Sequence, residues 1–221
     1  MTKPILISIE GNIATGKSTH FEYIKTLKLA NIYFVDEPVE EWRNIKDNNN
    51  MNALECFYND KKNSFCFQVL AYITRLKKLI DIIKKYPNDI IISERCIESD
   101  KNVFAKMLYE SGDISSIEWE TYNYWYNSFS QTSKVDLIIY IATDPVECLN
   151  RIKTRNRTEE VSIPLGYLEQ CHNKHEEWLN STLVPVITID GSKPIEEIRI
   201  EINEIMEKII ENKATLDNIF K

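Results

Sequence analysis

The nine residues from Gly11 to Thr19, GNIATGKST, constrain this chain more than any other stretch. They match the phosphate-binding pattern G-x-x-x-x-G-K-[ST] at every position. Glycine adopts backbone angles that a Cβ atom forbids, so Gly11 and Gly16 let successive N–H groups turn inward at a helix N-terminus. Lys17 adds charge for the outer phosphates, and the Ser18 hydroxyl is placed to ligate magnesium. The motif predicts a site for ATP and Mg²⁺, formed by Gly11, Asn12, Ala14, Thr15, Gly16, Lys17, Ser18 and Thr19.

The stretches around this motif predict the fold class. Residues 5–9 form an apolar, β-branched run that is typical of a buried strand, and residues 19–30 are compatible with a helix. Strand, loop and helix is the order that the motif requires. Similar apolar runs alternate with helical stretches along the rest of the chain; the runs are 32–35, 90–92, 137–141 and 186–189, and the helical stretches are 64–86, 102–109, 115–130 and from 195 onward. This alternation predicts a three-layer α/β fold with a five-stranded parallel sheet flanked by helices.

Length and composition narrow the remaining possibilities. With 221 residues and 43% hydrophobic content, the chain is expected to form a single domain over residues 1–221. No apolar run approaches the ~20 residues of a membrane span, and the N-terminus lacks a signal-peptide core, so we expect a soluble, cytoplasmic protein without a membrane partner. The net charge of −7 disfavours binding to nucleic acid. Five cysteines without a C-x-x-C pair indicate neither a zinc site nor a disulfide framework.

Charged residues follow two of the predicted strands. Asp36 and Glu37 come after the second strand and before Pro38, while Glu94 and Arg95 follow the third. In an open α/β sheet, ligands bind at the carboxyl ends of the strands. We therefore expect a carboxylate pair there, an acid that reaches magnesium and a guanidinium that grips phosphate oxygens. The structural alternatives are an exposed strand end and a surface ion pair.

A third charged stretch runs from Arg151 to Arg157 and holds four cations in seven residues. Arg151 and Arg155 are one helical turn apart, so they project from one helix face, and a polar stretch follows as far as Pro164. Cations at a helix C-terminus also complement its dipole, which explains two of the four. A phosphate-binding lid over roughly residues 151–163 explains all of them, because phosphoryl transfer needs positive charge from several directions.

The combined motifs resemble those of the deoxynucleoside kinase family. The resemblance lies in residues 10–19, in EPVEEW at 37–42, in Phe67-Gln68, in Glu94-Arg95 with Ser99-Asp100, in the arginines of 151–157, and in the stretches 163–168 and 172–178. It covers the chain from about residue 5 to the last strand. It implies a P-loop kinase fold and an enzyme of nucleotide salvage that phosphorylates the 5′-hydroxyl of a deoxyribonucleoside with ATP.

The resemblance also implies roles for the catalytic residues. Glu37 would be the general base that takes the proton from the 5′-hydroxyl. Arg95 would steady that hydroxyl and the incoming phosphoryl group beside the phosphate-binding Lys17, and Ser18 with Glu94 would hold Mg²⁺. The lid would bind the donor phosphates through Arg151, Arg155 and Arg157.

For the nucleoside, the resemblance implies a binding site formed by Glu37, Trp42, Tyr58, Gln68, Arg75, Arg95, Asp100 and Glu160. Gln68 would hydrogen-bond the base, with Arg75 and Asp100 beside it. Tyr58 and Glu160 would meet the 3′-hydroxyl. Relatives with an Arg and an Asp at the base edge favour deoxycytidine or purine deoxynucleosides, because a 5-methyl group as in thymidine would crowd this polar pair.

Two other functions remain open from the residues alone. A deoxynucleoside monophosphate kinase shares the fold but needs cations near the acceptor phosphate, and Arg75 is a candidate. An NTP-hydrolysing switch or motor would use the acids after residues 32–35, but the chain has no D-x-x-G or N-K-x-D motif for a GTPase. The resemblance also suggests a homodimer through residues 100–130, whose aromatic side chains suit a core or a subunit interface.

Overall fold

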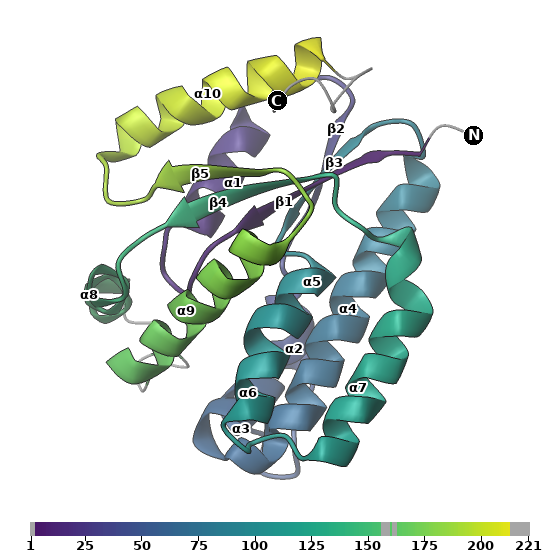
Figure 1. The fold of residues 1–221 in the computed structure, drawn as a ribbon, viewed down its shortest axis with the longest axis vertical. Coiled ribbons are helices and arrows are strands. Elements are labelled where there is room, and N and C mark those ends of the chain that lie inside the picture. Colours follow the sequence, from purple (N-terminus) through teal and green to yellow (C-terminus); the bar gives the residue numbers. More distant parts are fainter. Residues whose placement is uncertain (1–2, 156–159, 161–162, 213–221) are drawn as a thin grey trace.

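The computed structural model describes residues 3–155, 160 and 163–212. Within these ranges five strands form one parallel sheet in the order β2-β3-β1-β4-β5 (Figure 1). The strands are β1 (Ile5–Glu10), β2 (Ile32–Val35), β3 (Ile90–Glu94), β4 (Leu137–Ala142) and β5 (Val186–Asp190). Each predicted strand is confirmed, as is the α/β class with a parallel sheet.

The helices lie on both faces of the sheet (Figure 1). One face is covered by α1 (Lys17–Thr26) and α10 (Ile195–Glu211), and the other mainly by α4 (Ser64–Lys85) and α9 (Leu165–Ser181). The remaining elements are α2 (Val39–Asn44), α3 (Ala53–Asn59), η1 (Lys61–Asn63), α5 (Ile97–Ser99), the π-helix η2 (Asp100–Ala105), α6 (Lys106–Glu110), α7 (Ser116–Phe129), η3 (Ser130–Thr132) and α8 (Pro145–Arg155). This arrangement is the three-layer organisation that the sequence predicts.

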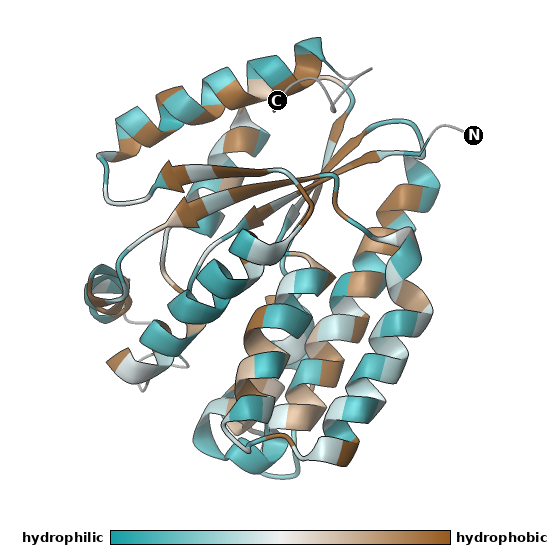
Figure 2. Ribbon diagram, viewed as in Figure 1, coloured by the Kyte–Doolittle hydropathy of each residue, from teal (hydrophilic) through white to brown (hydrophobic). Residues whose placement is uncertain are grey.

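Alternation along the strands produces the two hydrophobic cores. Ile7 and Ile9 of β1 pack with α1 and α10, whereas Leu6 packs with α4, η2 and α9 on the opposite face. Successive side chains of a strand point to opposite faces, so an apolar run such as β1 fills both cores at once. Figure 2 shows the strands as the most hydrophobic part of the ribbon and α10 as amphipathic.

Local sequence signals explain where several helices begin. Asn52 with Glu55 forms a capping box at the start of α3, and Ser115 with Glu118 does the same for α7. Pro145 is the first residue of α8, where its missing N–H costs no hydrogen bond. These caps satisfy N–H groups that have no partner inside the helix.

The structure differs from the predicted helices in three places. The first helix ends at Thr26 rather than at residue 30, and Lys28 takes a positive φ of 49°. The helical stretch expected at 102–109 begins at residue 97 and passes through the π-helical turn of η2. Of the aromatic side chains in α7, Tyr122 is buried, whereas Tyr124 is 74% exposed, so only part of the cluster belongs to the core. No helix among the described residues has the length and apolar character needed to cross a membrane.

Candidate active site

The phosphate loop joins β1 to α1 at the carboxyl edge of the sheet. Gly11 has φ 151°, and a Cβ atom there would lie 2.7 Å from both Ile141 O and Thr15 Oγ1. Gly16 has φ 100°, in the left-handed region that favours glycine. The Lys17 ammonium donates to Asn12 O at 2.6 Å and so lies over the loop. Burial, and then the charge of Arg95, lower the pKa of Lys17 to about 8.

Two oxygen ligands for a divalent cation lie side by side at this loop. The Ser18 hydroxyl donates to Glu94 Oε1 at 2.5 Å, and both side chains line the same cavity. Burial and the neighbouring charge of Glu37 raise the pKa of Glu94. Hard oxygen donors beside a phosphate loop suit Mg²⁺, which takes one or two protein ligands and completes its shell with phosphate and water. The residues present therefore fit the predicted metal.

The carboxylate pair expected after β2 is divided between two environments. Glu37 lies in the cavity, where Arg75 Nη2 donates to its Oε1 at 3.0 Å. Asp36 instead pairs with Lys25 at the exposed surface. Neighbouring residues of an extended segment point to opposite sides, so one carboxylate is directed into the site and the other away from it. The expectation of a carboxylate pair at the site is therefore wrong, and Glu37 alone is placed to act there.

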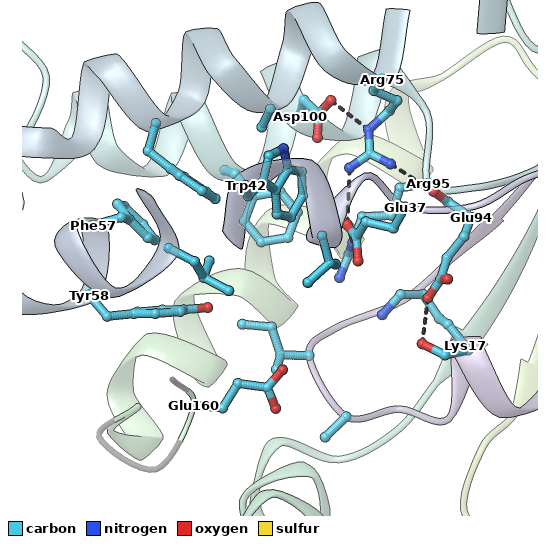
Figure 3. A pocket seen from close by; sticks show the side chains of 18 of the residues that line it. Lys17, Glu37, Trp42, Phe57, Tyr58, Arg75, Glu94, Arg95, Asp100 and Glu160 are labelled. Carbon is cyan, nitrogen blue, oxygen red and sulfur yellow. Dashed lines mark hydrogen bonds and ion pairs between the residues drawn. The ribbon is translucent and has the colours of Figure 1, made fainter. Parts of the chain in front are cut away.

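Arg75 connects Glu37 to the interior of the protein. Its Nε donates to Asp100 Oδ2 at 2.8 Å and its Nη1 donates to Glu94 O at 2.7 Å (Figure 3). Asp100 belongs to the π-helix η2, a distortion that is frequent at functional sites. Burial raises the pKa of Asp100, and the charge of Arg75 opposes that rise.

Arg95 follows β3 with a positive φ of 66°, which is unusual for a residue with a Cβ atom. Its Nε lies 3.4 Å from Glu37 Oε1, and its guanidinium lies over the Phe104 ring at 4.7 Å from the centroid. The side chain is only 5% exposed. Arg95 and Lys17 therefore approach the same space in front of Glu37.

These groups line one cavity with about 970 Å³ of empty space, part of it open to solvent. Trp42, Phe57 and Tyr58 form an aromatic side, and the charged residues at Glu37, Glu94 and Lys17 lie across from them (Figure 3). A concave pocket in which apolar and aromatic side chains meet convergent polar groups is typical of a small-molecule site. The predicted site residues that line it are Ala14, Gly16, Lys17, Ser18, Thr19, Glu37, Trp42, Tyr58, Gln68, Arg75, Glu94, Arg95, Asp100, Arg155 and Glu160.

Tyr58 and Glu160 lie together at the end of the cavity away from Arg75 (Figure 3). Burial and the charge of Glu160 raise the pKa of Tyr58, so its hydroxyl keeps its proton. Gln68 lies in α4 one turn before Ala71 and two turns before Arg75, and its side chain is buried. The cavity thus offers polar groups at separate positions beside its aromatic side.

The arginine stretch is only partly assembled around this cavity. Arg155 pairs with Glu160 at the cavity, but Arg151 donates to Thr15 O at 3.1 Å and Gly191 O at 2.9 Å. Arg151 lines a second cavity with Thr19 and His20, and Arg155 lines both cavities. Arg157 lies outside the described residues. Gly11, Asn12 and Thr15 form the buried inner part of the phosphate loop.

Comparisons with known proteins agree with this geometry. Residues 7–214 match the sequence profile of a family described as deoxynucleoside kinase. The chain belongs to the deoxynucleoside kinase family. Deoxycytidine kinase of Homo sapiens is 36% identical over an alignment of length 241, which covers 95% of this chain and 91% of the relative. Mitochondrial deoxyguanosine kinase of Xenopus laevis is 32% identical, with 96% and 86% covered, and a probable deoxycytidine kinase of Fowlpox virus is 40% identical, with 84% and 78% covered.

Several cavity residues of this family member had no predicted role. In the main cavity they are Ile13, Val39, Arg43, Leu54, Phe57, Phe67, Ala71, Phe104 and Tyr167, and in the second cavity they are His20, Glu147, Asn150, Thr154, Gly191, Lys193, Ile195 and Ile198. Most are apolar, and hydrophobic periodicity does not separate a pocket wall from a core. Phe57 and Phe67 had one available signal, since each adjoins a predicted site residue, Tyr58 and Gln68 respectively.

Proposed function

We propose that this chain transfers the terminal phosphoryl group of ATP to the 5′-hydroxyl of a deoxyribonucleoside. One observation carries the proposal: the phosphate loop and the Glu37 carboxylate line the same cavity, whose far end is aromatic. Membership of the deoxynucleoside kinase family supports the same reaction. The phosphate loop would bind the donor phosphates at one side of the cavity. Glu37 would accept a hydrogen bond from the hydroxyl that receives the phosphoryl group.

In this mechanism Glu37 orients the 5′-hydroxyl and takes its proton as the new bond to phosphorus forms. Burial acts to raise the pKa of Glu37, but the charges of Arg75, Arg95 and Lys17 hold it below its ordinary value. The carboxylate is therefore ionised at neutral pH. Arg75 fixes its direction through the hydrogen bond to Oε1.

Arg95, which follows β3, and Lys17, which begins α1, both line the cavity and would contribute positive charge to the transferred group. Arg151, Arg155 and Arg157 would add the lid charges. Ser18 and Glu94 would hold Mg²⁺, which would offset the charge of the donor phosphates. The second cavity borders Gly16 and Thr19, so it suits the nucleoside part of ATP.

The same cavity suggests how a deoxynucleoside is recognised. Tyr58 and Glu160 lie together where a sugar hydroxyl would accept and donate hydrogen bonds, and Gln68 offers an amide to the base. Arg75 and Asp100 lie beside it. We propose a preference for deoxycytidine or purine deoxynucleosides over thymidine, which the names of the deoxycytidine and deoxyguanosine kinase relatives support.

The monophosphate kinase alternative loses its main cation in this geometry. Arg75 was the candidate for the acceptor phosphate, but it is engaged with Glu37, Asp100 and the Glu94 carbonyl. A phosphate-transfer panel with four deoxynucleosides and their 5′-monophosphates tests the choice. We expect turnover of the nucleosides, led by deoxycytidine or a purine deoxynucleoside. Faster turnover of monophosphates, or ATP hydrolysis that is independent of an acceptor, would contradict the proposal.

We further propose a homodimer through the helices of residues 100–130, among which α7 lies beside α4 (Figure 1). Ile117 and Tyr124 are 73% and 74% exposed, and Ile73, Trp125 and Phe129 are also exposed. Such a gathering of large apolar side chains is typical of an interface. Light scattering of the purified chain should give twice the monomer mass. The single-domain organisation with its lid and the cytoplasmic location stay predictions.

A further inference from the structure

Glu10 is the last residue of β1 and has no role in the mechanism above. Its side chain is fully buried. Oε1 accepts hydrogen bonds from Ser8 Oγ at 2.5 Å and from the Cys96 N–H at 2.8 Å. Oε2 is also buried and has no hydrogen-bond partner among the described residues. A buried carboxylate oxygen without a hydrogen bond is costly, so its presence at the end of β1, beside the phosphate loop, requires an explanation.

The opposite charge nearest to this oxygen belongs to Arg95. Arg95 Nη1 lies 3.7 Å from Glu10 Oε2, which is close for an ion pair and too long for a hydrogen bond. Nη1 is itself buried without a hydrogen-bond partner in the described part of the chain. Two unsatisfied, oppositely charged atoms therefore face each other across a short gap, with the other side of the guanidinium toward Glu37.

The backbone around Arg95 also depends on β1. Arg95 has a left-handed φ of 66°, which costs a non-glycine residue roughly 1–2 kcal/mol. The Arg95 N–H donates to Ile9 O at 3.1 Å, and the next N–H, of Cys96, donates to Glu10. The end of β1 thus holds both the turn that carries Arg95 and the charge behind its guanidinium.

We propose that Glu10 is a positioning residue that keeps the Arg95 guanidinium between Glu10 and Glu37 in the phosphoryl-transfer reaction, within ion-pair distance of both and without a hydrogen bond to either. The Glu10 and Glu37 carboxylates attract the same guanidinium from two sides. Without the charge of Glu10, Arg95 would close onto Glu37 and cover the oxygen that the acceptor hydroxyl needs. With it, the guanidinium stays between the two acids, supported on the Phe104 ring, where it also meets the transferred group. The inference rests on the proposed function.

A purely structural role for Glu10 makes a different prediction. Glu10→Gln keeps a carbonyl oxygen that accepts from Ser8 and Cys96, but it removes the charge that attracts Arg95. If Glu10 only closes the turn, this variant should behave like the wild type. If Glu10 positions Arg95, kcat should fall by roughly 10–100-fold, since a displacement of about 1 Å at a reacting group costs about that much. The KM for ATP should stay within about twofold.

Ser8→Ala is the matched control, because it removes a hydrogen bond to the same carboxylate and leaves its charge. We expect its kcat to stay within about threefold of the wild type. Thermal unfolding of each variant measures the folded fraction. Unchanged kcat in folded Glu10→Gln, or an equal loss in Ser8→Ala, would overturn the inference.

A double-mutant cycle with Arg95→Lys isolates the connection between the two residues. If Glu10 acts through Arg95, Glu10→Gln should cost less than about twofold in the Arg95→Lys background. Equal factors in both backgrounds would also overturn the inference. Should Glu10→Gln not fold, Glu10→Asp takes its place in the cycle. The shorter side chain withdraws the carboxylate from Arg95, so the same dependence on the Arg95→Lys background is expected. Wild-type turnover is measured in the same assay, so its absence would instead contradict the proposed function.

Discussion

Arg75 Nη2 donates to Glu37 Oε1 at 3.0 Å from a side chain that is only 3% exposed. This buried ion pair fixes the direction of the carboxylate that we propose as the catalytic base. It also helps to lower the pKa of Glu37 against the opposing effect of burial. The charge state of the proposed base therefore depends on Arg75 of α4, together with Arg95 and Lys17.

Glu37→Gln tests the base directly. Glutamine keeps the size and one hydrogen-bond acceptor but takes no proton at neutral pH, so kcat should fall by roughly 10²–10⁴-fold. Binding of ATP, measured by calorimetry without acceptor, should change little. Asp36→Asn on the neighbouring residue is the matched control, because Asp36 pairs with Lys25 outside the cavity. A Glu37→Gln variant with wild-type turnover would remove Glu37 from this role.

Arg75→Gln should be strongly destabilising, because it leaves Glu37 and Asp100 buried without their common cation. Breaking a buried ion pair costs about 3–5 kcal/mol, which urea unfolding would detect. Adding Asp100→Asn should recover part of that loss, since it removes the second buried charge. Lys77→Gln serves as the control on the same helix, because the Lys77–Asp81 pair is exposed. Equal unfolding midpoints for Arg75→Gln and Lys77→Gln would contradict this account.

The pH dependence of kcat/KM for ATP should follow the protonation of the Lys17 ammonium group. Its pKa of about 8 belongs to the protein without phosphates, so kcat/KM for ATP should decline as pH rises through about 8. The kcat at saturating ATP should decline later, because bound phosphates favour the charged amine. Lys17→Arg should lower activity yet lose this basic limb, since its guanidinium stays protonated. If kcat/KM of the wild type declined only near pH 10, the pKa of Lys17 would not be lowered as described.

Glu98 links pH to stability. Burial raises its pKa to about 7, and its Oε2 has no hydrogen-bond partner within the ranges that the structure describes. The folded protein keeps this proton up to about pH 7, whereas the unfolded chain releases it near 4.5. The stability that the group contributes is therefore complete below 4.5 and is lost as pH rises through about 7.

Glu98→Gln should consequently raise the free energy of unfolding at pH 8 by about 1–3 kcal/mol, and by much less at pH 5. Urea unfolding at the two pH values measures the difference. Glu120→Gln, on the exposed part of α7, controls for the substitution itself. A Glu98→Gln variant that gains equally at both pH values would disagree with the raised pKa.

Much of the fold follows from short-range signals in the sequence. The strand at 32–35 was predicted with its observed bounds, because a short apolar run between polar residues is typical of a buried strand. The strand–loop–helix context placed Lys17 and Ser18 correctly, since glycine positions dictate the turn. Glu94 and Arg95 reach the cavity because parallel strands deliver their carboxyl ends to one edge.

Other features depend on tertiary contacts. Nothing local distinguishes Asp36 from Glu37, and only the direction of the extended segment separates them. Tyr122 and Tyr124 look alike in sequence, but one faces the α4 side chain of Tyr72 and the other is exposed. The π-helical turn that places Asp100 has no sequence signature. The sequence does contain a signal for Gln68 and Arg75. They are polar residues seven apart on an apolar helix face, and buried polar side chains need hydrogen-bonding partners.

The strand order has a consequence for synthesis of the chain. β1 pairs with β3 and β4. Ile7 therefore cannot pair with Ile92 and Leu137 until these later residues have been synthesised. Until then the nascent chain carries an apolar strand with unpaired edges, which favours slow folding and a need for chaperones. The anion nest depends on contacts across this sheet, including the close approach of Gly11 to Ile141. We therefore expect nucleotide binding only after the strands of the sheet have paired.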